Sequence, residues 1–451
     1  MKKQFIVLVM LAAALVAGGI VAAQADIPEE LSEGITITYW NEWAGSQEAG
    51  MDEIVAMFNE SNEFGITVEQ NKFGAGPGLS ENISNAITTG ELPNLVGDGF
   101  VNNAQGWFLD GVLVPLDAYV EHPVWGLTED EAAVIDQSSL NINRPALSPF
   151  DGQLLAWPIG ISSNVLSVNM GMMEELSLDG APADFNQFRE AACGASELTA
   201  PSGDPVNGFA IRPSGDELFS FILNFGGFIF DEEANAYNFT NENAIAAMEY
   251  VAQLYADGCS YVPQGGFFSN TGEFSLGLNP FAAGSSVGVP FIQAPIDEAG
   301  LDITWINTTF PATEGNSTLV TFLRGVAMFQ GTPEENVATW LFIKYWATDA
   351  EAQQIWTEAA QYQPYNTATA AAVSDEFLAG NPQFASFADV LASGEVTLWS
   401  SPAHPRTRDV GNVVAELYTN ITVGGMDVAE AAAAAEEAAN EIYEEALEDL
   451  E

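Results

Sequence analysis

The chain has 451 residues, with 10 Lys and Arg against 63 Asp and Glu, two cysteines and two histidines. The formal charge of −53 excludes nucleic acid and anionic membranes as partners, because contacts to phosphate need clustered Lys and Arg. The length is too great for one ordinary core and predicts two lobes of roughly 150–200 residues each.

The first 25 residues have the pattern of a secretory signal peptide. Lys2 and Lys3 precede an apolar run over residues 5–16, and Ala23 to Ala25 form a cleavage site of the A-x-A type. A retained membrane anchor is the alternative. We expect cleavage after Ala25, which removes Lys2 and Lys3 and leaves a charge of −55. No lipobox cysteine is present, so we expect a soluble, secreted protein in the periplasm or on the extracellular side of the cell envelope.

Residues 34–99 predict alternating strands and helices. Strands are expected over residues 34–39 and 65–69, on either side of an amphipathic helix over 49–60, and a third strand over 92–99. This order predicts a parallel sheet with right-handed crossovers, and ligands usually bind at the carboxyl ends of such strands. The loop from Trp40 to Trp43 follows the first strand at such an end.

The stretch 151–169, DGQLLAWPIGISSNVLSVN, is typical of a chain that leaves one sheet and enters another. Two short β runs, over 153–157 and 165–168, flank Pro158 and Gly160, and proline cannot donate to a sheet ladder. A single strand with a bend is the alternative. The long β segment over residues 318–329 is the predicted place of a second crossover.

Helices are predicted over residues 243–256 and 334–347, the second opened by a cap at Thr332 and a first-turn proline. Residues 427–451 are rich in Ala and Glu, and Asp427 stands three residues before Glu430 as in a capping box. We expect this last helix to dock on its own lobe, with a coiled coil as the alternative.

The two cysteines, Cys193 and Cys259, are expected to form a disulfide, because an even count in an oxidising compartment favours pairing. Two buried free thiols are the alternative. No histidine lies near either cysteine in the sequence, so we expect neither a metal site nor a cofactor.

Catalysis has little support in the sequence. His122 and His404 are each followed by proline, and neither has the spacing of a metal ligand. Residues 284–288 match the G-x-S-x-G pattern around Ser286, but Val289 and Pro290 follow, so we expect no helix there and no nucleophile. A secreted glycoside hydrolase stays open as an alternative, since so acidic a chain allows many carboxylate pairs.

Binding has more support, because several tryptophans adjoin turn or polar residues. An aromatic face packs against the C–H face of a sugar ring while neighbouring polar groups bind its hydroxyls. Of these tryptophans we expect Trp40 and Trp43 at a ligand site; the full set is Trp40, Trp43, Trp107, Trp157, Trp305, Trp356 and Trp399.

A series of segments in fixed order resembles one known family over nearly the whole mature chain. The segments are ITITYWNEW, GELPNLVGDG, GVLVPLDAY, SPFDGQLLAWPIGISSNVLSVN, LRGVAMF, EENVATWLFIKYWATDAEAQQIWTEAAQYQPYN and PAHPRTRDV. They are similar to the extracellular solute-binding proteins of ABC importers, of the family 1 type related to maltose- and glycerol-phosphate-binding proteins.

The resemblance implies an α/β fold of the two-lobed type II periplasmic-binding-protein class. Each lobe would hold a mostly parallel sheet flanked by helices, and crossing strands would form the hinge. We expect residues 26–161 and 325–349 in the first lobe, and 162–324 and 350–451 in the second. A monomer would close on a small ligand and dock on the membrane subunits of an ABC permease.

Carried over by position, the resemblance implies a set of cleft residues. The chain departs from the family pattern at Ser167-Val168, where an aromatic pair is usual, and at Gln361, where glycine is usual. The implied ligand-binding residues are Trp40, Asn41, Glu42, Trp43, Asp98, Ser162, Gly325, Tyr362 and Arg406.

The expected ligand is a neutral saccharide or polyol, held without catalysis. A phosphate ester would want a clamp of fixed cations, and Arg406 and Arg408 are the only close pair of basic residues in the mature chain. A glycerol-phosphate-type ligand is therefore the alternative.

Overall fold

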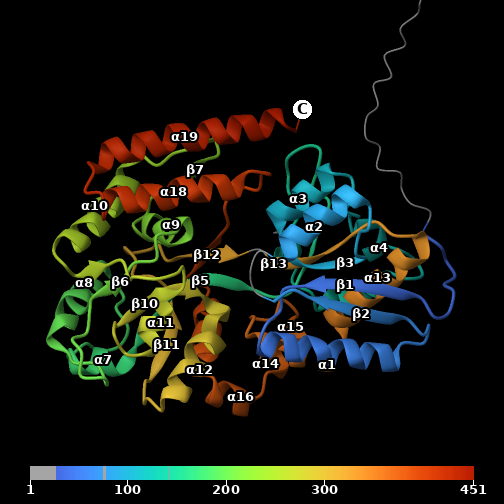
Figure 1. The fold of residues 1–451 in the computed structure, drawn as a ribbon, viewed down its shortest axis with the longest axis horizontal. Coiled ribbons are helices and arrows are strands. Elements are labelled where there is room, and N and C mark those ends of the chain that lie inside the picture. Colours follow the sequence, from blue (N-terminus) through green and yellow to red (C-terminus); the bar gives the residue numbers. More distant parts are fainter. Residues whose placement is uncertain (1–26, 75–77, 142, 323, 451) are drawn as a thin grey trace, which may run out of the picture.

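A computed structural model of the chain describes residues 27–74, 78–141, 143–322 and 324–450. The predicted signal peptide lies outside the described residues. The rest confirms the two-lobed α/β architecture: two sheets, each covered by helices, lie side by side and are joined by crossing segments (Figure 1). None of the described helices combines the length and apolar character that a bilayer crossing requires.

The sheet of the first lobe has five strands in the order β2-β1-β3-β13-β4. Its first three strands are parallel, as predicted, while β13 runs antiparallel to both β3 and β4. In β1 the buried Ile37 and Tyr39 alternate with threonines, the period-2 pattern of a strand that packs on one face. The bounds are β1 (Thr36–Asn41), β2 (Thr67–Lys72), β3 (Leu95–Phe100), β4 (Trp157–Pro158) and β13 (Arg324–Met328).

Helices cover both faces of this sheet. Helix α13 begins with the predicted Thr332 cap, completed by Glu335 as a capping box, and buries Trp340 and Phe342. The helices of this lobe are α1 (Ser46–Ser61), α2 (Gly78–Thr89), α3 (Val101–Leu109), α4 (Asp117–Val120), α5 (Glu129–Ala133), α6 (Gln137–Asn141), α13 (Pro333–Thr348), α14 (Ala350–Ala360) and α15 (Thr367–Ala372).

The first lobe continues past the predicted boundary at residue 349. Trp356 of α14 lies edge-on to both Trp43 and Trp346, and Gly50 of α1 lets Ala359 approach so closely that an added Cβ would lie 2.5 Å from the Ala359 Cβ. Helices α14 and α15 therefore pack with the first lobe, not with the second as predicted.

The second sheet is built around β5, whose eight residues are all buried. Strands β10, β11 and β12 pair with β5 in the antiparallel sense, while β6 and β9 continue parallel to β10 and β14 runs parallel to β12. The bounds are β5 (Ser162–Asn169), β6 (Phe209–Ala210), β9 (Ser260–Tyr261), β10 (Phe281–Ser285), β11 (Trp305–Thr308), β12 (Thr318–Phe322) and β14 (Thr397–Trp399).

The second lobe packs a phenylalanine-rich core between this sheet and its helices, with Phe188 stacked on Phe281 and Phe221 edge-on to Phe310. A small hairpin pairs β7 (Phe230–Asp231) with β8 (Ala236–Tyr237). The helices are α7 (Met170–Glu175), α8 (Phe185–Gly194), α9 (Gly215–Asn224), α10 (Glu242–Ala256), α11 (Ser269–Ser275), α12 (Val289–Ala299), α16 (Asp375–Gly380), α17 (Pro382–Ala392), α18 (Thr407–Ile421) and α19 (Val428–Glu448), with single 3₁₀ turns η1 (Ala195–Glu197) and η2 (Ser286–Gly288).

The last two helices form a hairpin on the outside of the second lobe (Figure 1). The Asp427 carboxylate accepts a bond from the Glu430 backbone N–H at 3.0 Å, as expected of a cap. Ala432, Ala439 and Tyr443 are buried in the core of the second lobe, which confirms that this helix docks on its own lobe.

Both predicted crossovers are present. The chain passes from β4 in the first sheet to β5 in the second, and returns from β12 to β13. Gly160 lies at φ 148° between β4 and β5, and a Cβ there would lie 2.4 Å from the Cβ of Tyr362, so the position requires glycine. Two backbone bonds between Ile161 and Gln363, of 2.8 and 3.1 Å, fasten this crossing to the segment that follows α14.

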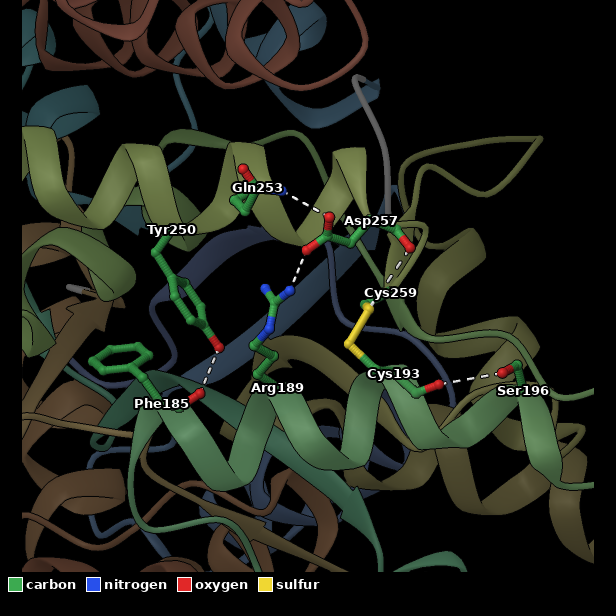
Figure 2. The surroundings of a disulfide bond; sticks show 8 residues. All are labelled: Phe185, Arg189, Cys193, Ser196, Tyr250, Gln253, Asp257 and Cys259. Carbon is green, nitrogen blue, oxygen red and sulfur yellow. Dashed lines mark hydrogen bonds and ion pairs between the residues drawn. A yellow bond between two sulfur atoms is a disulfide. The ribbon is translucent and has the colours of Figure 1, made fainter.

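The cysteines form a disulfide that joins the end of α8 to the residues after α10 (Figure 2). Beside it, Arg189 of α8 forms an ion pair with Asp257, whose other oxygen accepts a bond from Gln253 at 2.7 Å. Arg189 holds the pKa of the Asp257 carboxyl below its ordinary value. The covalent bond and the ion pair thus connect the same two helices.

A fully buried carboxyl, Glu217, connects α9 to α18. The Tyr418 hydroxyl donates to it at 2.9 Å, and the Arg212 backbone N–H donates at 3.2 Å. Burial raises the pKa of Glu217 from 4.5 to about 8, against the opposing effect of the Arg212 charge.

We predict that replacing Cys193 and Cys259 together by serine lowers the free energy of unfolding by about 4 kcal/mol, since the bond closes a loop with a sequence separation of 66. Urea unfolding of the wild type and the double variant measures the difference. Equal unfolding midpoints, or two titratable thiols in the denatured wild-type protein, would contradict the disulfide.

We predict that Glu217 makes stability depend on pH. Its pKa is higher in the fold than in the unfolded chain, so its contribution is complete below pH 4.5 and is lost as pH rises through about 8. Glu217→Gln should therefore gain stability relative to the wild type between pH 5 and 8 in urea unfolding. The exposed Glu416→Gln on α18 is the control, and parallel profiles for Glu217→Gln and the wild type would rule out the effect.

Candidate functional site

The strand directions show which edge of the second sheet faces the first lobe. Strand β5 begins at Ser162, directly after the crossing, and Asn164 of β5 stands opposite Ser285 at the carboxyl end of β10. Strands β6 and β9 run parallel to β10, so their carboxyl ends lie at the same edge. Residues that follow these ends, among them Arg212 and Phe267, belong to this lobe-facing edge.

The first sheet presents its carboxyl ends in the same way. Strand β13 begins at Arg324, directly after the return crossing, and Arg324 pairs with Phe100 at the carboxyl end of β3. Strand β1 runs parallel to β3 and ends at Asn41. The carboxyl ends of both sheets therefore meet at the crossings, where the fold favours ligand binding.

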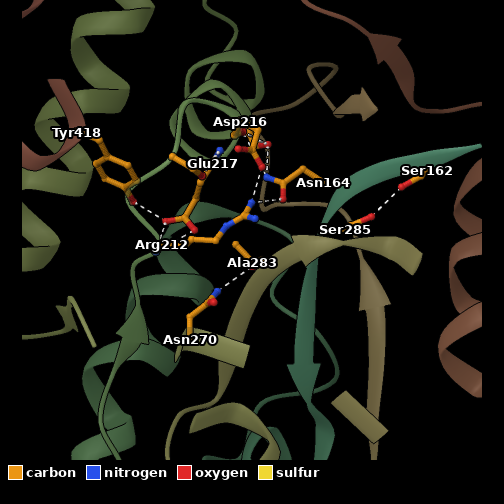
Figure 3. A network of polar contacts seen from close by, with 11 residues as sticks. Ser162, Asn164, Arg212, Asp216, Glu217, Asn270, Ala283, Ser285 and Tyr418 are labelled. Atoms are coloured by element: carbon orange, nitrogen blue, oxygen red, sulfur yellow. Dashed lines mark hydrogen bonds and ion pairs between the residues drawn. The ribbon is translucent and has the colours of Figure 1, made fainter. Parts of the chain in front are cut away.

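A polar network occupies the edge of the second lobe (Figure 3). The hydroxyls of Ser162 and Ser285 are 2.7 Å apart. Further along the edge, the Arg212 guanidinium donates to the Asn164 amide oxygen at 3.3 Å and forms an ion pair with Asp216. The network fixes hydroxyl, amide and carboxylate groups side by side on short strands and the start of α9.

An aromatic pair, Phe267 and Phe268, lies beside Arg212 of this network. Phe267 is 56% exposed and Phe268 is 70% exposed, and their rings meet edge to face at 5.1 Å. The Arg212 guanidinium lies 4.9 Å from the centre of the Phe267 ring, within the range of a cation–π contact. The loop after β9 thus holds one ring on a fixed cation and leaves much of both rings open to solvent.

On the first lobe, Glu42 and Tyr362 approach each other through Arg324. The Glu42 carboxylate pairs with the Arg324 guanidinium at 2.6 Å. Burial raises the pKa of Tyr362, while the neighbouring Arg324 charge opposes this rise. Arg324 therefore brings two predicted site residues together at the return crossing.

A pocket of about 520 Å³ lies between the lobes. Its lining comes from the first residue of α1, the first turns of α12, the start of β11, the end of α14 and the junction of α16 and α17. The polar network, the aromatic pair and Glu42, Arg324 and Tyr362 lie outside this lining. Most of its polar side chains are amides and hydroxyls. Its lining consists of Ser46, Val289, Pro290, Gln293, Ala294, Asp297, Ile303, Thr304, Trp305, Glu358, Ala359, Gln361, Gly380, Asn381, Pro382 and Gln383.

Two residues of the predicted first loop lie in the core instead. Trp43 is 1% exposed, donates to the Tyr39 hydroxyl at 2.7 Å and packs on Trp356. Asn41 is buried and its amide accepts from the Trp43 backbone N–H and donates to Gln70. From the sequence we expect Asn41 and Trp43 to contact the ligand, but these bonds use their side chains inside the core of the first lobe. Trp40 is half-buried against Phe73.

Of the remaining predicted residues, some lie at the crossings and others have structural roles elsewhere. Ser162 and Gly325 lie at the crossings, but a Cβ at Gly325 would lie 2.5 Å from the Trp157 carbonyl oxygen, so sheet packing explains this glycine. Arg406 forms ion pairs with Asp409 and with Glu445 of α19, and so supports the helix hairpin. The backbone of Asp98 is part of β3, while its side chain lies outside what the structure describes.

The expectation that no helix follows Ser286 is wrong. Helix α12 begins at Val289, and Pro290 occupies its first turn, where the missing proline N–H is not needed. The Ser286 hydroxyl accepts from the Ser163 backbone N–H, while His404 pairs with Tyr237 and His122 with the backbone of residues 124 and 125. Neither histidine is thus available as a base to Ser286 in this arrangement.

Sequence reasoning missed Arg212, Asn164 and the aromatic pair. Strands β6 and β9 have two residues each, too short for a periodic pattern, so the residues after them gave no signal of a shared edge. Phe267 and Phe268 follow two glycines and precede Ser-Asn, and an aromatic pair inside so polar a loop was the available clue. Among the described residues, no group of three or more His, Cys, Asp or Glu could hold a metal ion.

Several solved structures share this architecture. The GacH receptor of Streptomyces glaucescens, described with acarbose, has a TM-score of 0.73 and 17% identity, with 93% of this chain and 100% of that chain covered. The sugar-binding protein MalE of Xanthomonas citri has a TM-score of 0.72 and 16% identity, covering 91% and 98%. The cyclic alpha-maltosyl-1,6-maltose binding protein of Arthrobacter globiformis has a TM-score of 0.70 and 17% identity, covering 91% and 99%.

No curated protein matches the chain in sequence. The family model described as bacterial extracellular solute-binding protein matches residues 53–386, which is most of the chain and includes both crossings. This match, over two lobes joined by crossing segments, settles the family: the chain belongs to the bacterial extracellular solute-binding proteins.

Proposed function

We propose that this protein is the substrate-binding component of an ABC importer, and that it captures a neutral saccharide or polyol between its lobes. The observation that carries the proposal is a pocket lined by both lobes, by α1 and α14 of the first and by α12 and α17 of the second. Two lobes joined only by crossing segments can close on a ligand, provided the ligand contacts the closed form better than the open one. We place the protein in the periplasm or on the outer side of the envelope, as a monomer that delivers its ligand to a membrane permease.

The lining of the pocket supports a polyhydroxyl ligand. Gln293, Gln361, Asn381 and Gln383 bring carboxamides to it, and each carboxamide both donates and accepts hydrogen bonds. A sugar hydroxyl has the same double capacity, so amides match it without needing charge. Three structural neighbours are described as binding acarbose, cyclic alpha-maltosyl-1,6-maltose and maltose.

The distribution of cations argues against a phosphate ester. Within the described part of the chain, Arg408 is the one basic residue outside an ion pair; the paired ones are Lys72, Arg144, Arg189, Arg212, Arg324, Lys344 and Arg406. A clamp for a phosphate needs several cations that are not already neutralised. The neutral ligand is therefore favoured over the glycerol-phosphate alternative.

The glycoside hydrolase alternative needs a carboxylic acid with a raised pKa at the site. Glu217 has such a pKa, about 8, but it is fully buried and bonded to Tyr418 and to the Arg212 backbone. Its position favours a structural role. A binding function without turnover is thus our proposal.

The first experiment is a titration of residues 26–451 with mono-, di- and trisaccharides, and then with glycerol phosphates, followed by tryptophan fluorescence and calorimetry. We expect a saturable response to a saccharide at micromolar concentration, with no hydrolysis of aryl glycosides. A response confined to the phosphate esters, turnover of a glycoside, or silence across the panel would each contradict the proposed function.

We further predict that Phe267 and Phe268, which lie outside the pocket lining beside Arg212, stack on a part of the saccharide that reaches the lobe-facing edge. Loss of one stacked ring, worth about 1.5 kcal/mol, corresponds to about tenfold weaker binding. Calorimetry on Phe267→Ala and Phe268→Ala measures the change for the tightest saccharide of the panel. The control is Phe228→Ala, because Phe228 is 41% exposed but lies beside the start of α10, where its carbonyl accepts from Asn241. Unchanged affinity in both loop variants would remove the pair from the site.

A further inference from the structure

We propose that the side-chain oxygen of Gln361 reads one hydroxyl of the bound saccharide and so sets the specificity of the interlobe pocket. The inference rests on the proposed saccharide function and adds a named acceptor to it. Its basis is a set of three observations: the backbone conformation of Gln361, an unpartnered oxygen on its buried side chain, and its place in the pocket lining.

The backbone of Gln361 is in the left-handed region, at φ 60° and ψ 22°, where it ends helix α14. Glycine is the usual residue at such a helix end, because a Cβ makes this conformation costly. Strained residues of this kind persist where the surroundings hold them, and they gather at functional sites. Glycine would be enough to end the helix, so the presence of a glutamine side chain at this position needs a separate explanation.

The orientation of the Gln361 amide follows from its neighbours. The Phe377 carbonyl can only accept, so the Asn381 amide turns its nitrogen to it, at 2.8 Å. The Asn381 oxygen then faces Gln361 and accepts from the Gln361 nitrogen at 3.0 Å. This chain of bonds leaves the Gln361 oxygen, Oε1, pointing away from Asn381.

That oxygen has no hydrogen-bond partner in the described structure, although the residue is only 7% exposed. A buried acceptor without a donor costs free energy, so native proteins rarely leave one open without a purpose. Two other amides of the pocket make bonds of their own: the Gln293 oxygen accepts from Trp305 at 2.9 Å, and the Gln383 nitrogen donates to the Trp305 carbonyl at 3.1 Å. Of the described residues that line the pocket, Gln361 is the one with a buried side-chain oxygen that lacks a partner, and we assign this acceptor to the ligand.

The two helices that begin at the pocket complement this acceptor. Helix α1 starts after Gly45 and α12 after Gly288, and neither N-cap residue makes a side-chain bond to its helix. Ser46 and Val289, the first residues of these helices, line the pocket. A hydroxyl can accept from the start of α1 and donate to Gln361 at once, which a group without a donor hydrogen cannot do. The start of α12 offers fewer donors, because Pro290 has no backbone N–H and η2 runs directly into this helix.

The test compares Gln361→Gly with the wild type, using the saccharide that binds most tightly in the panel and its monodeoxy analogues. We expect Gln361→Gly to bind the parent saccharide about tenfold more weakly, the usual effect of one lost hydrogen bond. One deoxy analogue should bind the wild type about tenfold more weakly than the parent, yet bind Gln361→Gly as well as the parent does. That coupling assigns the hydroxyl to Gln361.

The control is Ser177→Gly, which makes the same backbone change at φ 61° after α7 and should leave affinity unchanged. Thermal unfolding of both variants checks that they fold. Equal affinity of wild type and Gln361→Gly, or equal losses for every deoxy analogue in both proteins, would overturn the inference while saccharide binding stands. Silence of the wild type toward every saccharide would overturn the proposed function and this inference with it.

Discussion

The close contact between the crossing segments is the constraint on which the rest of the molecule depends. Gly160 lies against Tyr362, and Ile161 pairs with Gln363 through two backbone bonds. This contact fixes where β5 begins and where the chain continues after α14. Because β5 and β13 each start at a crossing, the carboxyl ends of both sheets must lie beside it. The strands that start or end at the crossings are therefore enough to place the polar groups of the site next to one another.

The charged residues also determine which ligand the site can bind. The chain carries 63 acidic residues, yet nearly all of its described cations are held in ion pairs such as Arg212–Asp216 and Arg324–Glu42. These pairs fix side chains near the crossings without leaving a free positive field. The pocket lining has two carboxylates, four amides and no Lys or Arg, so recognition there depends on directed hydrogen bonds more than on positive charge. A neutral polyhydroxyl ligand suits such a surface.

The sequence predicted the elements better than it predicted the site. Alternating strands, caps such as Thr332 and both crossovers follow from local patterns, because periodicity and turn chemistry act over a few residues. The first-loop tryptophans show the limit: Trp43 has polar neighbours in sequence, but in space it packs on Trp356, which comes more than 300 residues later. Burial set by such distant partners has no local signature.

The same cause explains two further failures of the sequence prediction. Helix α14 was assigned to the second lobe although it packs with the first, and Arg212 gave no signal because it follows a strand of only two residues. Gln361, by contrast, was visible in advance as a departure from the resembling family, although its unpaired oxygen was not.

Closure of the two lobes around a ligand is the central claim, and small-angle X-ray scattering tests it most directly. The measurement compares residues 26–451 with and without a saturating saccharide, under conditions where calorimetry shows one site filled. Closure predicts a smaller radius of gyration and a shorter maximum dimension in the presence of the saccharide. Stoichiometric binding with an unchanged scattering curve would show that the ligand does not draw the lobes together, and would contradict the account.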